Sequence, residues 1–191
     1  SFYTQDGKNV LPLGTLTVEE TKSPTGYLLE GAYLQANGSS EQIKGLYVTQ
    51  ITEDGDLAVL TGSNQYHVSD KVIRGGVKAQ KRDLETGNTK PQGGATLKDT
   101  AFTITSLNDN AVLVEGKLYN KGEVVKTIHT GIDGIASTSA DLLPYGRYEL
   151  AEQTPPTGYL TDGAKPITFE ITEDEKIVDL TGKDTSIYNQ I

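Results

Sequence analysis

The stretch LTVEETKSPTGY at residues 16–27 occurs a second time, as YELAEQTPPTGY, at residues 148–159. The two copies lie 132 residues apart, and in each an alternating segment with a glutamate near its end runs into a Pro-x-Gly-Tyr turn. A repeat with so long a period indicates tandem copies of one structural module. The alignment makes Glu20 and Glu152 equivalent acids on equivalent strands. We expect the turn to be structural in both copies, with its tyrosine covering the core.

The composition of the chain favours β-structure and argues against several classes of function. Its 191 residues include 21 glycines and 10 tyrosines but no cysteine, methionine or tryptophan, and 35% of them are hydrophobic. The net charge of −9 argues against a nucleic-acid partner, which would require a basic patch. No apolar run reaches membrane-spanning length, and the lack of cysteine excludes disulfides and thiolate metal sites. We therefore expect no nucleic acid, no membrane insertion in this segment, no metal and no cofactor.

Short alternating segments separated by turn residues predict an all-β fold, with a complete antiparallel β-sandwich over residues 75–191. We expect residues 167–171 and 176–180 to form a hairpin. The other predicted strands of this module are 77–83, 101–105, 112–114, 124–129, the repeated segment from 148, and a closing strand at 185–191.

Residues 1–74 are predicted to be a partial module of the same fold. Residues 51–54 match 171–174 at an offset of 120, so the first copy carries 12 extra residues, which we place near 34–46. Only 15 residues precede the repeated segment, so we expect the strands equivalent to 77–129 to be missing from this chain. The Gly75-Gly76 pair at the junction is expected to turn freely.

Three polar residues of the second module occupy positions where the period-two pattern calls for core residues. They are Lys81, Glu152 and Asn189, and each alternates in phase with the apolar residues of its own strand. One such residue would be ordinary, but three of complementary chemistry suggest that they meet. Buried singly, each would be costly.

Brought together in a dry core, these three groups are able to react. Burial disfavours the charged form of an amine, so Lys81 is expected to lose its proton readily, whereas a buried Glu152 carboxyl is expected to stay protonated. A neutral amine is a nucleophile, and a protonated carboxyl can polarise the Asn189 carboxamide and relay a proton to departing ammonia. The expected product is an isopeptide bond between Lys81 Nζ and the side-chain carbon of Asn189.

The Lys-x-Asp pattern at 81–83, the glutamate motif at 148–159 and the last-strand asparagine resemble the B-type repeat domain of collagen adhesins. Such CnaB- or SpaA-like domains recur in Gram-positive surface proteins and sortase-assembled pilins. The resemblance covers nearly all of 77–191 and, as a partial copy, 11–72. It implies a transthyretin-like (prealbumin-like) β-sandwich and an internal isopeptide bond promoted by Glu152. It also implies an extracellular, cell-wall-associated stalk or pilin-type role, with neighbouring modules of the same surface protein or pilus as partners.

The first module matches this pattern only in part. Glu20 matches the promoting acid, and Asp70 best fills the last-strand position if one extra residue is allowed in the preceding loop. Without that gap Ser69 would align, and a serine could not form the bond. No lysine-bearing first strand precedes these residues. We therefore predict no bond within this chain's first module, with Asp70 as a partner for a lysine lying upstream in the full protein.

Simpler interpretations of the same residues stay open. Lys81 would then be an edge lysine whose amine reaches water, Glu152 a surface acid like Glu149, and Asn189 a turn residue. Lys78 is the rival nucleophile, but it points to the opposite face of its strand.

Two other functions compete with the stalk hypothesis. One is an adhesin that binds a host matrix protein or glycan through the insertion near 34–46, since function gathers on long loops. The other is a glycan-active hydrolase, which is disfavoured because Glu152 lies in a core-facing phase with no second acid clearly paired to it. The leading interpretation is not an enzyme in the turnover sense, because Lys81 and Asn189 are consumed.

Overall fold

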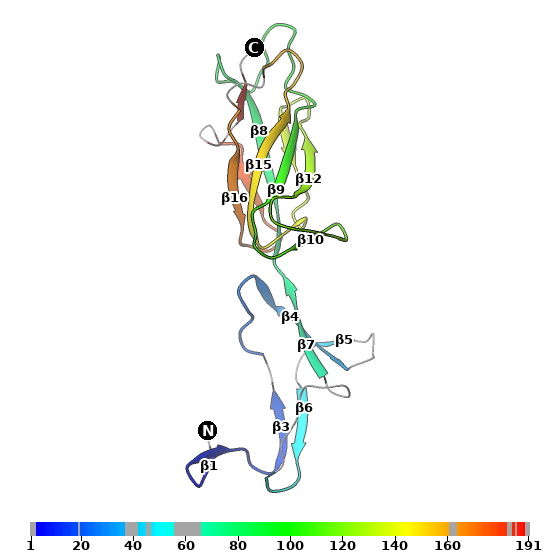
Figure 1. The fold of residues 1–191 in the computed structure, drawn as a ribbon, viewed down its shortest axis with the longest axis vertical. Helices are drawn as coiled ribbons and strands as arrows, with labels where there is room; N and C mark the ends of the chain where they lie inside the picture. Colours follow the sequence, from blue (N-terminus) through cyan, green and yellow to red (C-terminus); the bar gives the residue numbers. More distant parts are fainter. Residues whose placement is uncertain are drawn as a thin grey trace. The chain divides into compact units, whose positions relative to one another are not determined.

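The computed structural model describes residues 3–18, 20–36, 42–44, 47–55, 66–160, 164–182, 185 and 187–189. Every regular element within these residues is a β-strand, so the predicted all-β class is confirmed (Figure 1). The chain divides into two compact units, Ser1–Lys71 and Val72–Ile191, and each is described by itself.

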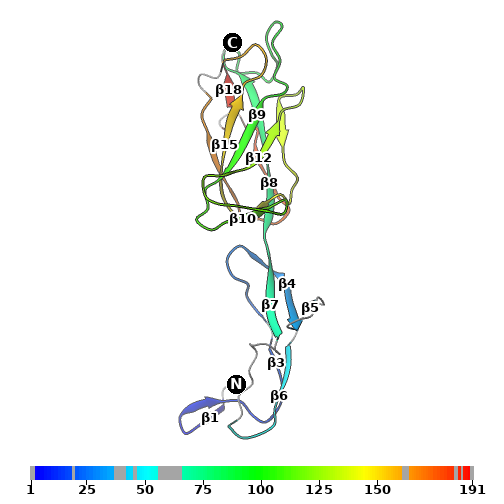
Figure 2. The same ribbon diagram turned by 45° about the vertical axis from the view of Figure 1, so that its right-hand side comes forward.

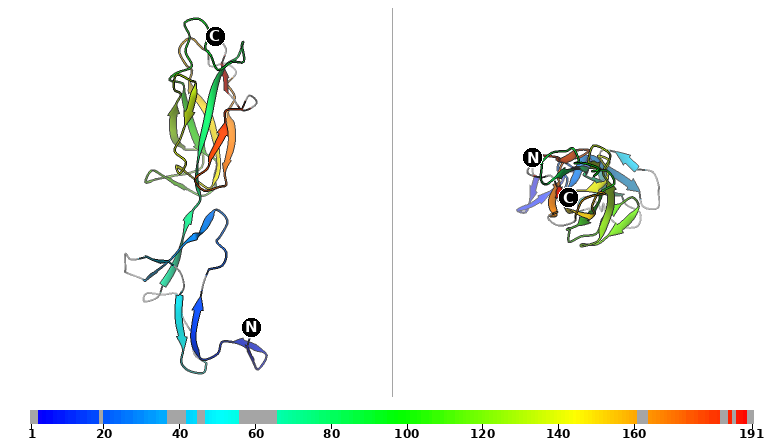
Figure 3. Two further views of the ribbon diagram at one scale, coloured as in Figure 1. Left: turned by 180° about the vertical axis from the view of Figure 1, so that it is seen from behind. Right: turned by 90° about the horizontal axis from the view of Figure 1, so that it is seen from above.

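The second unit is a β-sandwich of two sheets that face each other across an apolar core (Figure 1; Figure 3, left). The first sheet has the order β12 (Val124–His129), β9 (Ala101–Ser106), β15 (Gly146–Thr154) and β16 (Ile167–Ile171). The second sheet is built on β8 (Arg74–Asp83), which pairs with β13 (Ile135–Ser137), β14 (Leu143–Pro144), β17 (Ile177–Leu180) and β18 (Ile187–Asn189). A separate hairpin joins β10 (Val112–Val114) and β11 (Lys117–Tyr119).

The core forms because alternate residues of the facing strands point inward. Burial along β8 alternates from Val77 onward, and in β15 the buried residues include Tyr148 and Leu150. The Tyr148 ring stacks on Phe169 of the neighbouring β16, with ring centroids 5.8 Å apart. The period-two pattern of the sequence therefore identified the inward faces of these strands correctly.

The hairpin predicted for 167–171 and 176–180 is wrong. β16 pairs with β15 in the first sheet, whereas β17 pairs with β8 in the second, and both β17 and β18 run parallel to β8. The turn between β16 and β17 is bound to the start of β8: Arg74 N donates to Asp174 Oδ1 at 3.0 Å, and Glu175 N donates to Arg74 O at 2.7 Å. These bonds hold the turn at which the chain passes from the first sheet to the second. A local sequence pattern does not reveal such a crossing, because it depends on residues far away in the chain.

The expectation that Gly75 and Gly76 turn freely is also wrong. Both lie inside β8 and are buried, and Gly76 N donates to Lys176 O at 2.9 Å. A Cβ on Gly76 would lie 2.2 Å from the carbonyl oxygen of Ser139, and one on Gly75 would lie 2.8 Å from Lys176 O. Glycine is therefore required here for close backbone approach rather than for a turn.

The first unit contains a β3–β6 sheet, a sheet of order β5-β4-β7 and a β1–β2 hairpin. Their bounds are β1 (Tyr3–Gln5), β2 (Lys8–Val10), β3 (Gly14–Val18), β4 (Tyr27–Ala36), β5 (Gln42–Lys44), β6 (Tyr47–Ile51) and β7 (Tyr66–Val72). The insertion predicted near 34–46 begins within β4 and includes β5, which pairs with β4. Its remaining residues, 37–41 and 45–46, lie outside the described part of the chain.

The two copies of the repeat have the same strand pairing. Gly14 of β3 pairs with Ile51 of β6, and the equivalent Gly146 of β15 pairs with Ile171 of β16. The next four residue pairs follow in step along both ladders. The offset of 132 residues thus relates β3 to β15, and the offset of 120 residues relates β6 to β16, their pairing partners.

The Pro-x-Gly-Tyr turns also match in backbone geometry. Tyr27 N donates to Pro24 O at 3.1 Å, Tyr159 N donates to Pro156 O at 3.2 Å, and the intervening glycines have φ of 87° and 88°. The tyrosines differ in exposure, however. Tyr159 is 7% exposed and Tyr27 is 43% exposed, so the expectation that the turn tyrosine covers the core is confirmed in the second unit and wrong in the first.

Replacing Gly76 with alanine should destabilise the second unit, because the added Cβ would collide with a backbone oxygen that no side-chain rotation can move. We expect the free energy of unfolding to fall by about 2–3 kcal/mol, measured by urea or thermal unfolding. Gly94→Ala is the matched control, since nothing lies within 4 Å of its added Cβ. Equal stability of the two variants would contradict the close approach at Gly76.

Candidate functional site

Lys81 and Glu152 form a buried ion pair between the two sheets of the sandwich. Lys81 lies on β8 and Glu152 on β15, and Lys81 Nζ is 2.5 Å from Glu152 Oε2. The side chains are 0% and 2% exposed, respectively. The interpretations of Lys81 as an edge lysine and of Glu152 as a surface acid are therefore wrong, because neither group reaches water.

Aromatic and aliphatic residues surround the lysine. The Phe102 ring centroid lies 6.0 Å from Lys81 Nζ, and Phe102 is also the register partner of Glu152. On the other side, β18 places the buried Ile187 directly opposite Lys81. The ladder between β15 and β9 shifts register just after Glu152, which is the kind of irregularity that re-aims a side chain beside a site.

Burial lowers the pKa of the Lys81 ammonium group, while the hydrogen bond and the charge of Glu152 act in the opposite direction. The pair carries no net charge in either of two forms, ammonium with carboxylate or amine with carboxyl. Removal from water favours the neutral form of an amine, and that form has the lone pair that a nucleophile needs.

Asn189 lies on β18, which pairs in parallel with β8, the strand of Lys81. Figure 2 shows both strands in the second unit. Its register partner is Asp83, two residues beyond Lys81, and its own side chain lies outside the described part of the structure. Neighbouring strands lie about 4.8 Å apart and rise about 3.3 Å per residue, so the Cα atoms of Lys81 and Asn189 are about 8 Å apart. An extended lysine reaches roughly 6 Å from its Cα, and an asparagine carboxamide carbon lies about 2.5 Å from its own Cα. The backbone thus allows a bond between them.

Lys78 does not compete for this site. It lies on the opposite face of β8, 37% exposed, with its amine 3.3 Å from Asp179 Oδ2 at the surface. Glu149 of β15 likewise lies on the other face from Glu152. The alternation of the sequence therefore separated the buried lysine and acid from their neighbours correctly.

Sequence reasoning named Asp83 and Tyr159 as parts of the motifs but did not predict that they contact each other. Asp83 is fully buried on β8, and its carboxylate accepts hydrogen bonds from Thr86 N at 2.8 Å, Gln92 Nε2 at 3.0 Å and the Tyr159 hydroxyl at 2.9 Å. The available signal was its phase, because Asp83 alternates with Lys81 on the inward face. That signal went unused since its partners lie in a loop and a turn that no strand pattern connects.

In the first unit, Glu20 and Asp70 lie together. Burial raises the pKa of the Glu20 carboxyl, and the charge and hydrogen bond of Asp70 raise it further. Asp70 Oδ1 is buried and has no hydrogen-bond partner among the described residues. The sequence alignment that paired these two acids thus placed them next to each other. A reaction of Asp70 with a lysine from elsewhere stays a prediction.

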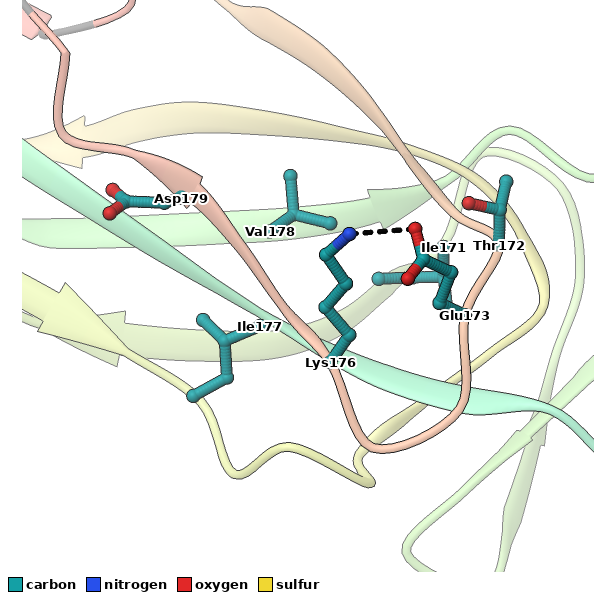
Figure 4. A pocket seen from close by; sticks show the side chains of 7 residues that line it. All are labelled: Ile171, Thr172, Glu173, Lys176, Ile177, Val178 and Asp179. Carbon is teal, nitrogen blue, oxygen red and sulfur yellow. Dashed lines mark hydrogen bonds and ion pairs between the residues drawn. The ribbon is translucent and has the colours of Figure 1, made fainter.

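Other candidate sites are weaker. Over the described ranges no group of three or more histidine, cysteine, aspartate or glutamate residues is arranged to hold a metal ion. In the same ranges no helix is long and apolar enough to cross a membrane. One pocket of about 270 Å³ lies between β16 and β17 (Figure 4), which is smaller than typical ligand sites of about 300–1,000 Å³. Its ion pair, Lys176 with Glu173 at 2.6 Å, is exposed at the surface.

The buried amine should make stability depend on pH when its carboxyl partner is removed. In a Glu152→Gln variant, Lys81 keeps a pKa below its ordinary 10.5, so between the two values the unfolded chain binds more protons than the folded one. The free energy of unfolding should then rise with pH toward 10.5, by up to about 1.4 kcal/mol per pH unit. Urea unfolding between pH 8 and 10 measures this slope. Adding Lys81→Met should flatten it, and equal slopes would mean that Lys81 is not a buried base.

Comparison with known proteins identifies the fold family. Residues 76–186 match the family model of the SpaA prealbumin-like fold domain. The Bacillus anthracis TIE protein has a similar structure, with a TM-score of 0.55 and 24% identity over 98% of this chain, which spans 28% of that protein. The comparison with GBS52, the minor pilin of Streptococcus agalactiae, has a TM-score of 0.39 and 16% sequence identity, and it covers 100% of this chain and 88% of GBS52. The comparison with BcpA, the major pilin subunit of Bacillus cereus, has a TM-score of 0.42 and 19% identity, and it covers 84% of this chain and 55% of BcpA. No curated protein matches. Because the family model covers more than half of the chain, the protein belongs to the SpaA family of prealbumin-like domains.

Proposed function

We propose that the second unit is a structural stalk or pilin-type module of a Gram-positive cell-surface protein, held together by an isopeptide bond between Lys81 and Asn189. The observation that carries this proposal is the buried contact between Lys81 and Glu152, whose Nζ and Oε2 atoms are 2.5 Å apart. Lys81 lies on β8, and β8 pairs with β18, the strand of Asn189. Membership of the SpaA family and the tandem repeat support a modular surface role, extracellular and associated with the cell wall.

The proposed chemistry begins with a proton transfer within the buried pair. Lys81 passes a proton to Glu152, and the neutral amine attacks the side-chain carbon of Asn189 while the protonated carboxyl polarises its carbonyl oxygen. The new carbon–nitrogen bond forms as the bond from that carbon to Nδ2 breaks. Nζ gives up two protons in all: one reaches the leaving nitrogen through Glu152, so that one ammonia departs, and the other stays on Glu152, which ends as the neutral carboxyl. The fold supplies proximity, which removes a large part of the barrier.

The proposed bond acts on the mechanics of the module. β8 is its first strand and β18 its last, and the two run parallel side by side. A covalent bond between them fixes both ends of the sandwich to each other, so a pulling force would be carried by the bond rather than by strand hydrogen bonds. In the chain-entropy model, closing a loop of about 100 residues destabilises the unfolded chain by about 4.7 kcal/mol. A stalk benefits from both effects.

The proposed reaction happens once per molecule. Lys81 and Asn189 are consumed, so the module is not an enzyme with turnover. Its proposed partners are neighbouring modules of the same surface protein or pilus. Binding of host matrix or glycan through the insertion near 34–46 stays a prediction, since residues 37–41 lie outside the described part and no other feature favours it.

The mass of the intact protein tests the bond directly. We expect the purified protein to be lighter than its sequence by one ammonia, because Nδ2 of Asn189 leaves. Glu152→Ala should restore the full mass, since the proton relay is lost. Glu149→Ala, on the same strand but the opposite face, should keep the reduced mass. Tryptic peptides bearing Lys81 and Asn189 that separate after denaturation of the wild type would exclude the bond.

Loss of the bond should lower thermal stability. In Asn189→Ala the cross-link cannot form while the Lys81–Glu152 pair stays intact. We expect Tm to fall by roughly 20–40 °C, from about 4.7 kcal/mol of lost loop-closure stabilisation at about 4–8 °C per kcal/mol. Calorimetry of the two proteins measures the shift. Tyr188→Phe, next to the bond-forming position, is the control, and an equal Tm for Asn189→Ala and wild type would contradict a stabilising bond.

A further inference from the structure

Asp83 is a second buried charge beside the cross-linking site, and the proposed chemistry does not use it. It lies two residues beyond Lys81 on the inward face of β8 and is fully buried. Donors from Thr86, Gln92 and Tyr159 surround its carboxylate at 2.8–3.1 Å. A buried charge is tolerated only when such bonds replace its water, so this neighbourhood is built to hold an ionised carboxylate.

The Tyr159 hydroxyl connects that carboxylate to the chain that carries Glu152. Tyr159 lies in the turn that follows β15, and Glu152 lies near the end of β15. Since β8 and β15 belong to different sheets, two side-chain bonds bridge the sandwich at this end. The Lys81–Glu152 bridge contains the reacting amine, whereas the Asp83–Tyr159 bridge contains no group that changes in the reaction.

The turn that holds Tyr159 is packed against the loop that holds Gln92. Thr96 N donates to Thr157 O at 3.2 Å, and a Cβ on Gly158 would lie 3.0 Å from the Ala95 Cβ. Gly158 also has φ of 88°, which favours glycine. The backbone of this turn therefore places the Tyr159 side chain, and the Tyr159 hydroxyl donates a hydrogen bond to Asp83 from that position.

The first copy of the motif shows that the turn alone does not bury the tyrosine. Tyr27 has the same turn hydrogen bond and the same glycine conformation as Tyr159, yet it is 43% exposed. The second unit adds β8 with Asp83 and the loop of Gln92 and Ala95, which packs against this turn. The burial of Tyr159 thus depends on segments beyond the turn itself.

The protonation states favour a strong bond. Burial would raise the pKa of Asp83, but its hydrogen bonds from Thr86, Gln92 and Tyr159 outweigh burial and lower it. Burial and the Asp83 carboxylate raise the pKa of Tyr159 to about 12. At neutral pH a protonated hydroxyl therefore donates to an ionised carboxylate, which is the stronger, charge-assisted kind of hydrogen bond.

We infer that Asp83 and Tyr159 are positioning residues for the cross-link, because their hydrogen bond holds the Lys81 strand in place against the Glu152 strand. Asp83 is also the register partner of Asn189, so this clamp lies at the level of the acceptor. Without this hydrogen bond, the end of β8 would be held less firmly, and the Lys81 amine could move relative to Glu152 and Asn189. Displacements of about 1 Å cost up to about 100-fold in rate. The inference rests on the proposed isopeptide function.

The test is the rate of cross-linking per folded molecule of the full chain. The chain is made in a short cell-free pulse and quenched in guanidinium at set times. Mass spectrometry then gives the fraction that has lost ammonia, while protease resistance at each time gives the fraction folded. We expect Tyr159→Phe, which removes only the hydroxyl, to lower the rate per folded molecule roughly ten-fold or more. Asp83→Asn, which keeps an oxygen acceptor for the hydroxyl, should react faster than Asp83→Ala.

Tyr148→Phe is the matched control. It also removes a fully buried tyrosine hydroxyl, one that donates to Pro144 O at 2.8 Å near the other end of β15. Any general loss of stability would affect both phenylalanine variants, but only Tyr159→Phe should slow the reaction of molecules that are already folded. Equal rates for the two variants would overturn the inference and leave the proposed function intact. A wild type that never loses ammonia would instead reject the proposed function, and the inference with it.

Discussion

The contact between Lys81 Nζ and Glu152 Oε2 is the interaction on which the second unit depends. Taking an ammonium and a carboxylate out of water costs several kcal/mol for each ion, and their attraction repays that cost only when both groups are well placed. The same cost creates reactivity, because it brings the neutral amine close in energy to the ion pair. Burial on both sides, at 0% and 2% exposure, is therefore a condition for the proposed chemistry as well as a property of the contact.

The topology of the second sheet is what makes this contact useful. β8 is the central strand of this sheet. β13 and β14 pair with it antiparallel, at residues 78–80 and 74–75, whereas β17 and β18 pair with it in parallel. A parallel last strand requires the chain to leave the first sheet after β16, and the bonds from Arg74 to Asp174 and Glu175 hold that crossing in place. The close approach at Gly76 belongs to the same arrangement. The start of β8 is bound to the turn at which the chain crosses between the sheets, and the end of β8 carries the buried Lys81.

Much of this could be predicted from the sequence, and the failures have a common physical cause. Period-two alternation identified Lys81 and Glu152 as inward-facing, because it depends on neighbours along one strand. The repeat identified equivalent segments, and the structure shows that they pair in the same way. The hairpin at 167–180 and the freely turning Gly75-Gly76 were wrong, because pairing across the sandwich decided both. The hydrogen bonds of Asp83 were not predicted for the same reason, since its partners lie in other segments of the chain.

The repeated motif therefore specifies less than its conservation between the copies suggests. Glu20 and Glu152 occupy equivalent positions, and both turns have the same hydrogen bond and glycine conformation. Yet Glu152 faces an amine, whereas Glu20 faces the carboxyl of Asp70, which raises its pKa. Two adjacent acids disfavour ionising together, while an acid beside an amine can exchange a proton with it. The motif supplies a placed carboxyl, and the strand that packs against it decides whether that carboxyl lies beside an amine or beside a second acid.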